Sequence, residues 1–198
     1  MRGGLAAHLT SLSGRFIHGS RHMRRRLFLF LAVCCLAAPV SVAAQMDGMG
    51  QEETIVVYLV RHSERAEDGS NDPPISEAGW TRSRLLATML ADANLTQLHS
   101  TDLKRTRSTG EPTAEAAGLA IDSYDPRDLP GFAARLKTMP GQHLVLGHSN
   151  TTPQLVAALG GEPGPDIEEM EYDRLYIVTI VGHHVSTVLL RFGEPFGG

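Results

Sequence analysis

A continuous run of β-branched and apolar residues at 54–60 constrains the fold of this chain more than any other feature of the sequence. A run of this kind is typical of a strand that is covered on both faces, as in a sheet with helices on either side. Further strands are predicted at 98–101, 119–124, 143–146, 174–181 and 185–192, and helices at 77–93, 103–117, 130–138 and 152–159. Strands and helices alternate, which predicts an α/β fold with a mostly parallel central sheet flanked by helices and an antiparallel C-terminal addition.

The predicted helix boundaries follow from single residues. Ser76 has the side chain of an N-cap, Pro153 suits a first helical turn, and Gly118 suits a helix end. Pro112 lies within the predicted helix 103–117 and is its weak point, because proline cannot donate the backbone hydrogen bond of a helix.

Charge divides the 198 residues into two parts. Residues 1–44 contain six arginines and no acidic residue, whereas the remainder carries a formal charge of −10. A body this acidic is not expected to bind nucleic acid or an anionic membrane surface through its general field.

The basic part has the features of an export signal. Three arginines, 24–26, precede a short apolar run at 27–38, and small residues at 42–44 offer a cleavage site before Gln45. Met23 would begin a compact signal peptide. The apolar run is shorter than the roughly 20 residues that span a bilayer, so no stable membrane insertion is expected after cleavage. Both cysteines lie within the leader, so the mature protein would form no disulfide.

We therefore divide the chain into a leader (1–44), a linker (45–53), a catalytic domain (54–192) and a tail (193–198), and expect a periplasmic or secreted protein.

Three polar clusters follow predicted strands, at residues 61–65, 100–109 and 147–151. In such sheets ligands bind at the carboxyl ends of the strands. Arg61, Arg65 and Arg105 would repel one another in one hollow without an anion, and their guanidinium groups match phosphate oxygens. A neutral imidazole can attack phosphorus, which makes His62 the candidate nucleophile, with His148 donating to a phosphate oxygen.

The same segments resemble the motifs of the histidine phosphatase superfamily, which is phosphoglycerate mutase-like. Residues 59–65 resemble its Arg-His-Gly signature, 75–79 its helix start, 101–109 its Ser-x-Leu-x-Arg-x-x-x-Thr block, and 145–151 its second-histidine motif. A small, single-domain, exported member is implied. The resemblance implies that His62 is phosphorylated and that Arg61, Arg65, Arg105 and His148 bind the phosphate of a small phosphorylated substrate. One departure is Ser63, where the family has glycine.

The family usually protonates the leaving group from a carboxyl group outside the two histidine motifs. The loop after the third predicted strand contains Asp125 and Asp128, and Asp128 is the preferred candidate. Asp128 could equally be a helix N-cap. Glu64 could serve instead, although between Arg61 and Arg65 it is more simply a partner that orients them.

The predicted activity is hydrolysis of a phosphomonoester or a phosphohistidine without metal or cofactor. A mutase needs a longer cover over its intermediate than the interval from Arg105 to His148 provides. Two alternatives are a non-catalytic phosphate-binding domain and a serine esterase. The esterase would use Ser149 with Asp166 or Asp173 and with one of two histidines, 183 or 184. Outside the esterase alternative, we expect these two histidines, and those at 99 and 143, to be surface or loop residues.

Overall fold

The structure is a computed structural model that describes residues 53–197, so the predicted leader lies outside the described residues. Its elements in chain order are β1 (Thr54–Arg61), α1 (Glu77–Met89), β2 (Gln97–Ser100), α2 (Lys104–Ala117), β3 (Ile121–Ser123), α3 (Leu129–Leu136), β4 (Gly141–Gly147), α4 (Thr151–Ala158), β5 (Arg174–Val181) and β6 (His184–Arg191). None of the helices in this part of the chain is long and apolar enough to cross a membrane.

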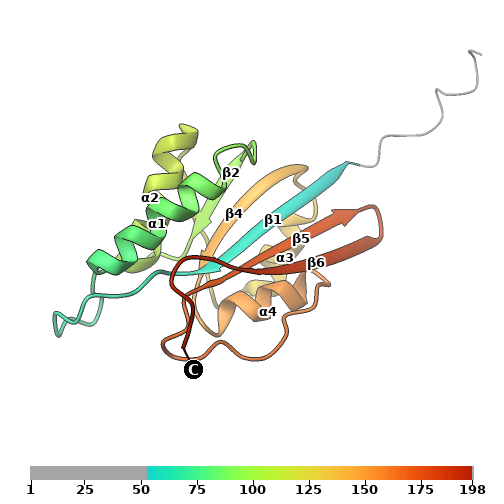
Figure 1. The fold of residues 1–198 in the computed structure, drawn as a ribbon. Coiled ribbons are helices and arrows are strands. Elements are labelled where there is room, and N and C mark those ends of the chain that lie inside the picture. Colours follow the sequence, from blue (N-terminus) through green and yellow to red (C-terminus); the bar gives the residue numbers. More distant parts are fainter. Residues whose placement is uncertain (1–52, 198) are drawn as a thin grey trace, which may run out of the picture. The chain divides into compact units, whose positions relative to one another are not determined.

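The strands form one six-stranded sheet in the order β3-β2-β4-β1-β5-β6 (Figure 1). The pairs β3·β2, β2·β4 and β4·β1 are parallel, whereas β5 runs antiparallel to β1 and forms a hairpin with β6. The predicted α/β fold with its antiparallel addition is therefore confirmed.

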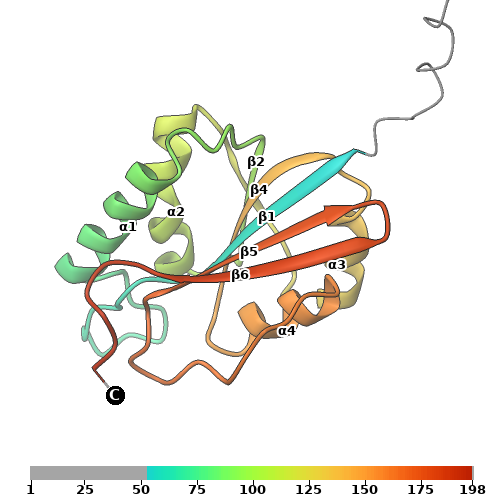
Figure 2. The same cartoon turned by 45° about the vertical axis from the view of Figure 1, so that its right-hand side comes forward.

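The two faces of β1 explain its continuous apolar run. Alternate residues Ile55, Val57 and Leu59 are buried in a core shared with α3 and α4. Val60 lies in a second core with residues of α1 and α2. The two helix pairs accordingly lie on opposite faces of the sheet (Figures 1 and 2). Because side chains alternate along a strand, both sets must be apolar, as the sequence pattern predicted.

Helix α1 is shorter than predicted, since it ends at Met89 rather than at residue 93. Residues 90–93 form turns, and Asn94 adopts a left-handed backbone with φ 51°, which asparagine tolerates better than most residues. Helix α2 continues through Pro112, because the face formed by Thr109, Gly110, Thr113 and Ala114 is buried against the sheet. It ends at Gly118, whose φ of 66° is left-handed.

Two histidines were wrongly predicted to lie at the surface. His99 and His143 are buried, their rings are stacked with centroids 5.6 Å apart, and His99 Nε2 lies 3.4 Å from His143 Nδ1. The Nε2 atom of His143 lies 2.8 Å from the carbonyl oxygen of Met139, to which it donates. His183 and His184 are exposed in the β5–β6 hairpin, as predicted.

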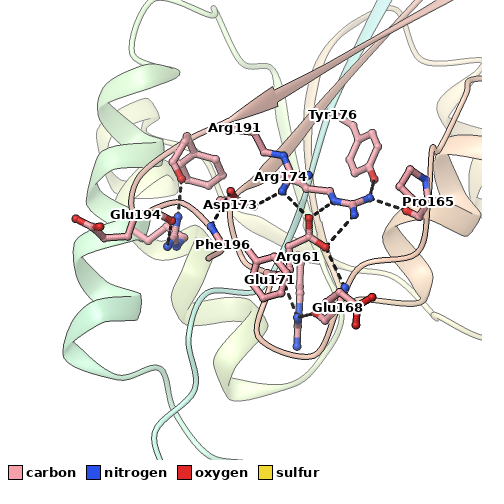
Figure 3. Close-up of polar contacts among 12 residues, drawn as sticks. Arg61, Pro165, Glu168, Glu171, Asp173, Arg174, Tyr176, Arg191, Glu194 and Phe196 are labelled. Atoms are coloured by element: carbon pink, nitrogen blue, oxygen red, sulfur yellow. Dashed lines mark hydrogen bonds and ion pairs between the residues drawn. The ribbon is translucent and has the colours of Figure 1, made fainter. Parts of the chain in front are cut away.

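The tail packs against the domain through Arg82 of α1. Its guanidinium group donates to the carbonyl oxygens of Phe192 (2.5 Å) and Glu194 (3.0 Å) and binds the carboxylate of Glu64 (2.8 and 2.9 Å). The backbone N–H of Phe196 donates to Asp173 at 3.2 Å. Figure 3 shows the tail beside the start of β5.

Candidate active site

The pairing of β1 with β4 brings the two candidate histidines together. Arg61 lies opposite Gly147 in the parallel register, and the backbone N–H of His62 donates to the carbonyl oxygen of Gly147 at 2.9 Å. His62 directly follows β1 and His148 directly follows β4, so this pairing places the two histidines side by side. The rings of His62 and His148 meet edge to face, with centroids 5.5 Å apart.

His62 is held as a neutral ring with a defined tautomer. Its Nδ1 lies 2.8 Å from the carbonyl oxygen of Ser63, so Nδ1 carries the proton and Nε2 keeps its lone pair. The residue is 4% exposed. Burial, together with the guanidinium group of Arg61 and the ring of His148, lowers the pKa of His62 to about 3. At neutral pH the Nε2 atom can therefore act as a nucleophile.

His148 is fixed from β2. Thr101 follows this strand, and its hydroxyl oxygen lies 3.0 Å from Nε2 of His148, which leaves Nδ1 as the ring nitrogen available to a ligand. Burial, with the charges of Arg105 and Arg61, lowers the pKa of His148 to about 4. An anion bound between the two rings would favour protonation of His148 by offsetting these positive charges.

Arg61 and Arg105 carry donors that the described residues leave unsatisfied. The Nε atom of each is buried without a hydrogen-bond partner. Buried donors are normally paired, and two such donors beside two histidines are the setting of an oxyanion site. Arg105 also forms an ion pair with Asp72 at 3.5 Å.

Arg65 lies at the edge of this group rather than inside it. Its side chain is 50% exposed and forms an ion pair with Glu169 at 3.0 Å. Its charge is nevertheless close enough to Arg61 to help lower the pKa of that guanidinium group, after the larger effect of burial.

Ser63 fits where the family has glycine. Its backbone N–H donates to Thr109 Oγ1 at 2.9 Å, and its hydroxyl lies 3.1 Å from that of Ser83 in α1. A glycine is needed instead at position 79 in α1, where a Cβ atom would lie 2.4 Å from the carbonyl oxygen of Glu64. Thr109 of α2 thus contacts Ser63, and Gly79 of α1 lets that helix pack against Glu64.

The candidate acids have partners of their own. Asp128 is the N-cap of α3 and accepts from the backbone N–H of Gly131 at 3.0 Å, as the alternative interpretation held. Asp125 is bound by Arg127, whose side-chain and backbone hydrogen bonds lower the pKa of Asp125 to about 2. Both aspartates thus have local hydrogen-bond partners, and the preference for Asp128 as the acid stays a prediction.

The interpretation of Glu64 was wrong in its partners. Its Oε1 atom accepts from Arg82 Nε and Nη2, and the structure shows no ion pair between Glu64 and Arg61 or Arg65 within residues 53–197. The sequence neighbours of Glu64 are not its partners because helix α1 brings the guanidinium group of Arg82 to its carboxylate.

One part of the site was missed from the sequence, namely the segment 168–172. Arg61 donates from Nη1 to the carbonyl oxygens of Glu168 (2.8 Å) and Glu171 (3.0 Å), and its guanidinium group lies 4.2 Å from the ring centre of Tyr172. The Tyr172 ring also lies 6.0 Å from that of His62. Strands β1 and β5 are antiparallel, so the residues just before β5 lie beside the end of β1. Predicting this strand pair from the sequence could therefore have identified the segment.

The residues proposed for a serine esterase come together only in part, since Ser149 and Asp166 line one pocket that neither His183 nor His184 lines. Ser149 follows β4 at the carboxyl end of β1, whereas the hairpin with His183 and His184 adjoins Thr54 at the opposite end. Asp173 accepts from Arg191 at 2.6 Å. In the described part of the chain, no group of three or more His, Cys, Asp or Glu residues is arranged to hold a metal ion.

Comparisons with known proteins agree with these observations. Residues 57–126 match the family model of the histidine phosphatase superfamily (branch 1). A curated relative from Yersinia pestis (strain Pestoides F), described as "Probable phosphoglycerate mutase GpmB", is 32% identical over 120 residues. The match covers 58% of this chain and 55% of the relative, so the chain spans about half the length of the curated relatives it matches.

Two solved structures have the same fold. The protein histidine phosphatase SixA, complexed with tungstate, superimposes with a TM-score of 0.57 at 20% identity, covering 69% of this chain and 97% of its own. Phosphoglycerate mutase from Bacillus anthracis gives a TM-score of 0.53 at 14% identity, covering 73% and 95%. Residues 57–126 of this chain are thus similar to the histidine phosphatase superfamily, and the chain has the phosphoglycerate mutase-like fold of these solved structures.

Proposed function

We propose that this domain is a phosphohydrolase that cleaves phosphomonoesters through a phosphohistidine on His62. The observation that carries the proposal is the pairing of a buried, neutral His62 with two buried arginine donors that lack partners. These are the two components that phosphoryl transfer needs, a nucleophile and fixed positive charge around the phosphoryl oxygens.

In the first step, the lone pair of His62 Nε2 attacks phosphorus. A P–N bond forms as the bond between phosphorus and the leaving oxygen breaks, and the leaving oxygen takes a proton. Arg61, Arg105 and a protonated His148 face the phosphoryl oxygens, whose charge they offset. The hydrogen bond from His62 Nδ1 to Ser63 stabilises the positive charge that the ring acquires.

In the second step, water attacks the phosphorus atom of the phosphohistidine. The P–N bond breaks, its electron pair returns to Nε2, and inorganic phosphate leaves. Asp128 is the proposed acid of the first step, and its conjugate base would accept the proton of the water in the second.

The relatives leave open a choice between hydrolysis and mutase chemistry. We favour hydrolysis, because the interval from Arg105 to His148 holds nearly all of α2, then β3, α3 and β4, and no inserted element that could form an additional cover over the site. SixA is described as a protein histidine phosphatase, so a phosphorylated histidine is a second candidate substrate.

The test is to trap the intermediate. The protein is mixed with a phosphomonoester carrying labelled phosphate and quenched within milliseconds. We expect an acid-labile, base-stable label that is absent from His62→Ala and present in the matched variant Ser149→Ala. A label on serine would contradict the proposal, and tight tungstate binding without turnover of any phosphoester would establish the non-catalytic alternative.

We also propose that residues 1–44 direct export, on the strength of their arginines and apolar run. Mass spectrometry of the protein from a periplasmic fraction should find an N-terminus at Gln45. Recovery of the uncleaved chain from the cytoplasm would contradict this.

A further inference from the structure

Arg61 is held by the backbone of the segment 168–172 rather than by a carboxylate. Its Nη1 atom donates to two carbonyl oxygens, those of Glu168 at 2.8 Å and Glu171 at 3.0 Å. The ring of Tyr172 covers its guanidinium plane, 4.2 Å from ring centre to Cζ. Both N–H groups of Nη1 are thereby used, which leaves Nε and Nη2 as the donors for a ligand, and Nε is buried without a partner.

The turn 168–171 has one backbone hydrogen bond, from the N–H of Glu171 to the carbonyl oxygen of Glu168 at 3.1 Å, and the carboxylate of Glu171, which is only 2% exposed, adds further bonds to it (Figure 3). This carboxylate accepts from Arg174 Nε at 2.6 Å and Nη2 at 2.8 Å, and from Arg191 Nη1 at 2.5 Å. It also accepts from the backbone N–H of Glu168 at 2.9 Å, which closes the turn between the two carbonyl groups that bind Arg61. The same residue thus supplies one of these carbonyls and fixes the other.

The charge of Glu171 is essential to this arrangement. Burial raises the pKa of its carboxyl group, but the hydrogen bonds from Arg174, from the Glu168 N–H and from Arg191 lower it more, to about 2. The carboxylate is therefore ionised at every working pH. A glutamine there would turn an amide N–H toward one of the guanidinium groups and leave the buried guanidinium of Arg174 without the carboxylate that pairs with it.

We infer that Glu171 is a positioning residue for phosphoryl transfer: it fixes the turn 168–171, whose two carbonyl groups aim Nε and Nη2 of Arg61 at the phosphate. The inference rests on the proposed function, since it assumes that Arg61 binds the phosphoryl group. Glu171 does not itself touch the substrate in this proposal. Its carboxylate binds the backbone N–H of Glu168, and the carbonyl oxygens of Glu168 and Glu171 bind Arg61.

The experiment is a double-mutant cycle with tungstate as the probe. Tungstate affinity is measured by calorimetry, and kcat and KM for a phosphomonoester are measured alongside, in wild type, Glu171→Gln, Arg61→Ala and the double variant. We expect Glu171→Gln to weaken tungstate binding about ten-fold in the wild-type background and by less than about two-fold when Arg61 is alanine. A role in stability alone would not depend on the residue at position 61.

Asp173→Asn is the matched control. Asp173 is equally buried and shares Arg191 with Glu171, but its carboxylate makes no hydrogen bond to the turn 168–171 in the described chain. We expect it to lower the melting temperature while leaving tungstate affinity within about two-fold of wild type. If Glu171→Gln does not fold, Arg191→Gln takes its place. Arg191 is 49% exposed, and its loss should weaken tungstate binding about three-fold, again only when Arg61 is present.

Equal losses in both Arg61 backgrounds would overturn the inference, as would an Asp173→Asn variant that weakens tungstate as much as Glu171→Gln does. In both cases a wild-type protein that hydrolyses phosphomonoesters would leave the proposed function standing. A wild-type protein that neither binds tungstate nor turns over a phosphomonoester would overturn both.

Discussion

The buried pair of His99 and His143 predicts how the stability of this domain depends on pH. His143 Nε2 donates to Met139, so its Nδ1 is the lone pair that accepts from His99 Nε2 and His143 is neutral. Burial and the neighbouring ring of His143 lower the pKa of His99 to about 4, and Asp122 and Arg135 are the charged groups that face it. An imidazole in the unfolded chain has a pKa of about 6.5.

The sign of the effect follows from linkage. Above pH 6.5, His99 is neutral in both states and contributes nothing to the pH dependence. Below pH 6.5, the unfolded chain binds a proton that the folded domain does not bind until about pH 4. A difference of 2.5 pKa units corresponds to a loss of about 3 kcal/mol in the free energy of unfolding as the pH falls from 6.5 to 4.

The assay is urea denaturation at a series of pH values between 7 and 4 in wild type and in His99→Gln. Glutamine keeps an N–H donor for His143 but does not titrate, so its pH dependence should be shallower by about 3 kcal/mol over this range. The exposed His184, changed to glutamine, is the matched control and should follow wild type. Parallel curves for wild type and His99→Gln would refute the reasoning.

Four further predictions concern the site. Because the pKa values of His62 and His148 are about 3 and 4, kcat/KM should not fall between pH 7 and pH 5 once the ionisation of the substrate is divided out; a fall with a midpoint near 6.5 would contradict this. Asp128→Asn should slow alkyl phosphates about a hundred-fold but spare aryl phosphates with acidic leaving groups, and Asp125→Asn should slow neither. Gly79→Ala puts a methyl group 2.4 Å from a backbone oxygen and should cost about 2 kcal/mol of stability in chemical denaturation. Dialysis against a chelator should leave activity within about two-fold of its starting value, and a loss that added metal restores would count against the mechanism.

The parts of the fold that could be predicted are those that depend on a local pattern of residues. The run at 54–60 indicated a strand with two covered faces, and its alternate residues do enter two cores. His62 and His148 could be found because each directly follows a strand, and the parallel register then places them together. The Ser76 cap and the Gly118 end depend on one residue each, and both were correct.

The parts that escaped prediction depend on contacts between distant segments. Arg61 binds carbonyl groups more than 100 residues away, and backbone carbonyls carry no signature in a sequence. Glu64 was paired with its neighbours in sequence, although a helix brings Arg82 to it. His99 and His143 appeared scattered only because their strands were not aligned, since parallel β2 and β4 place them on the same face.

The guanidinium group of Arg82 has a practical consequence for handling this protein. It binds Glu64, two residues from His62, and at the same time the carbonyl groups of Phe192 and Glu194. The final residues are thus anchored to the same cation as the peptide that carries the nucleophile. Engineering around Phe192 and Glu194 should therefore spare their contacts with Arg82, because losing these contacts would also disturb the peptide beside His62.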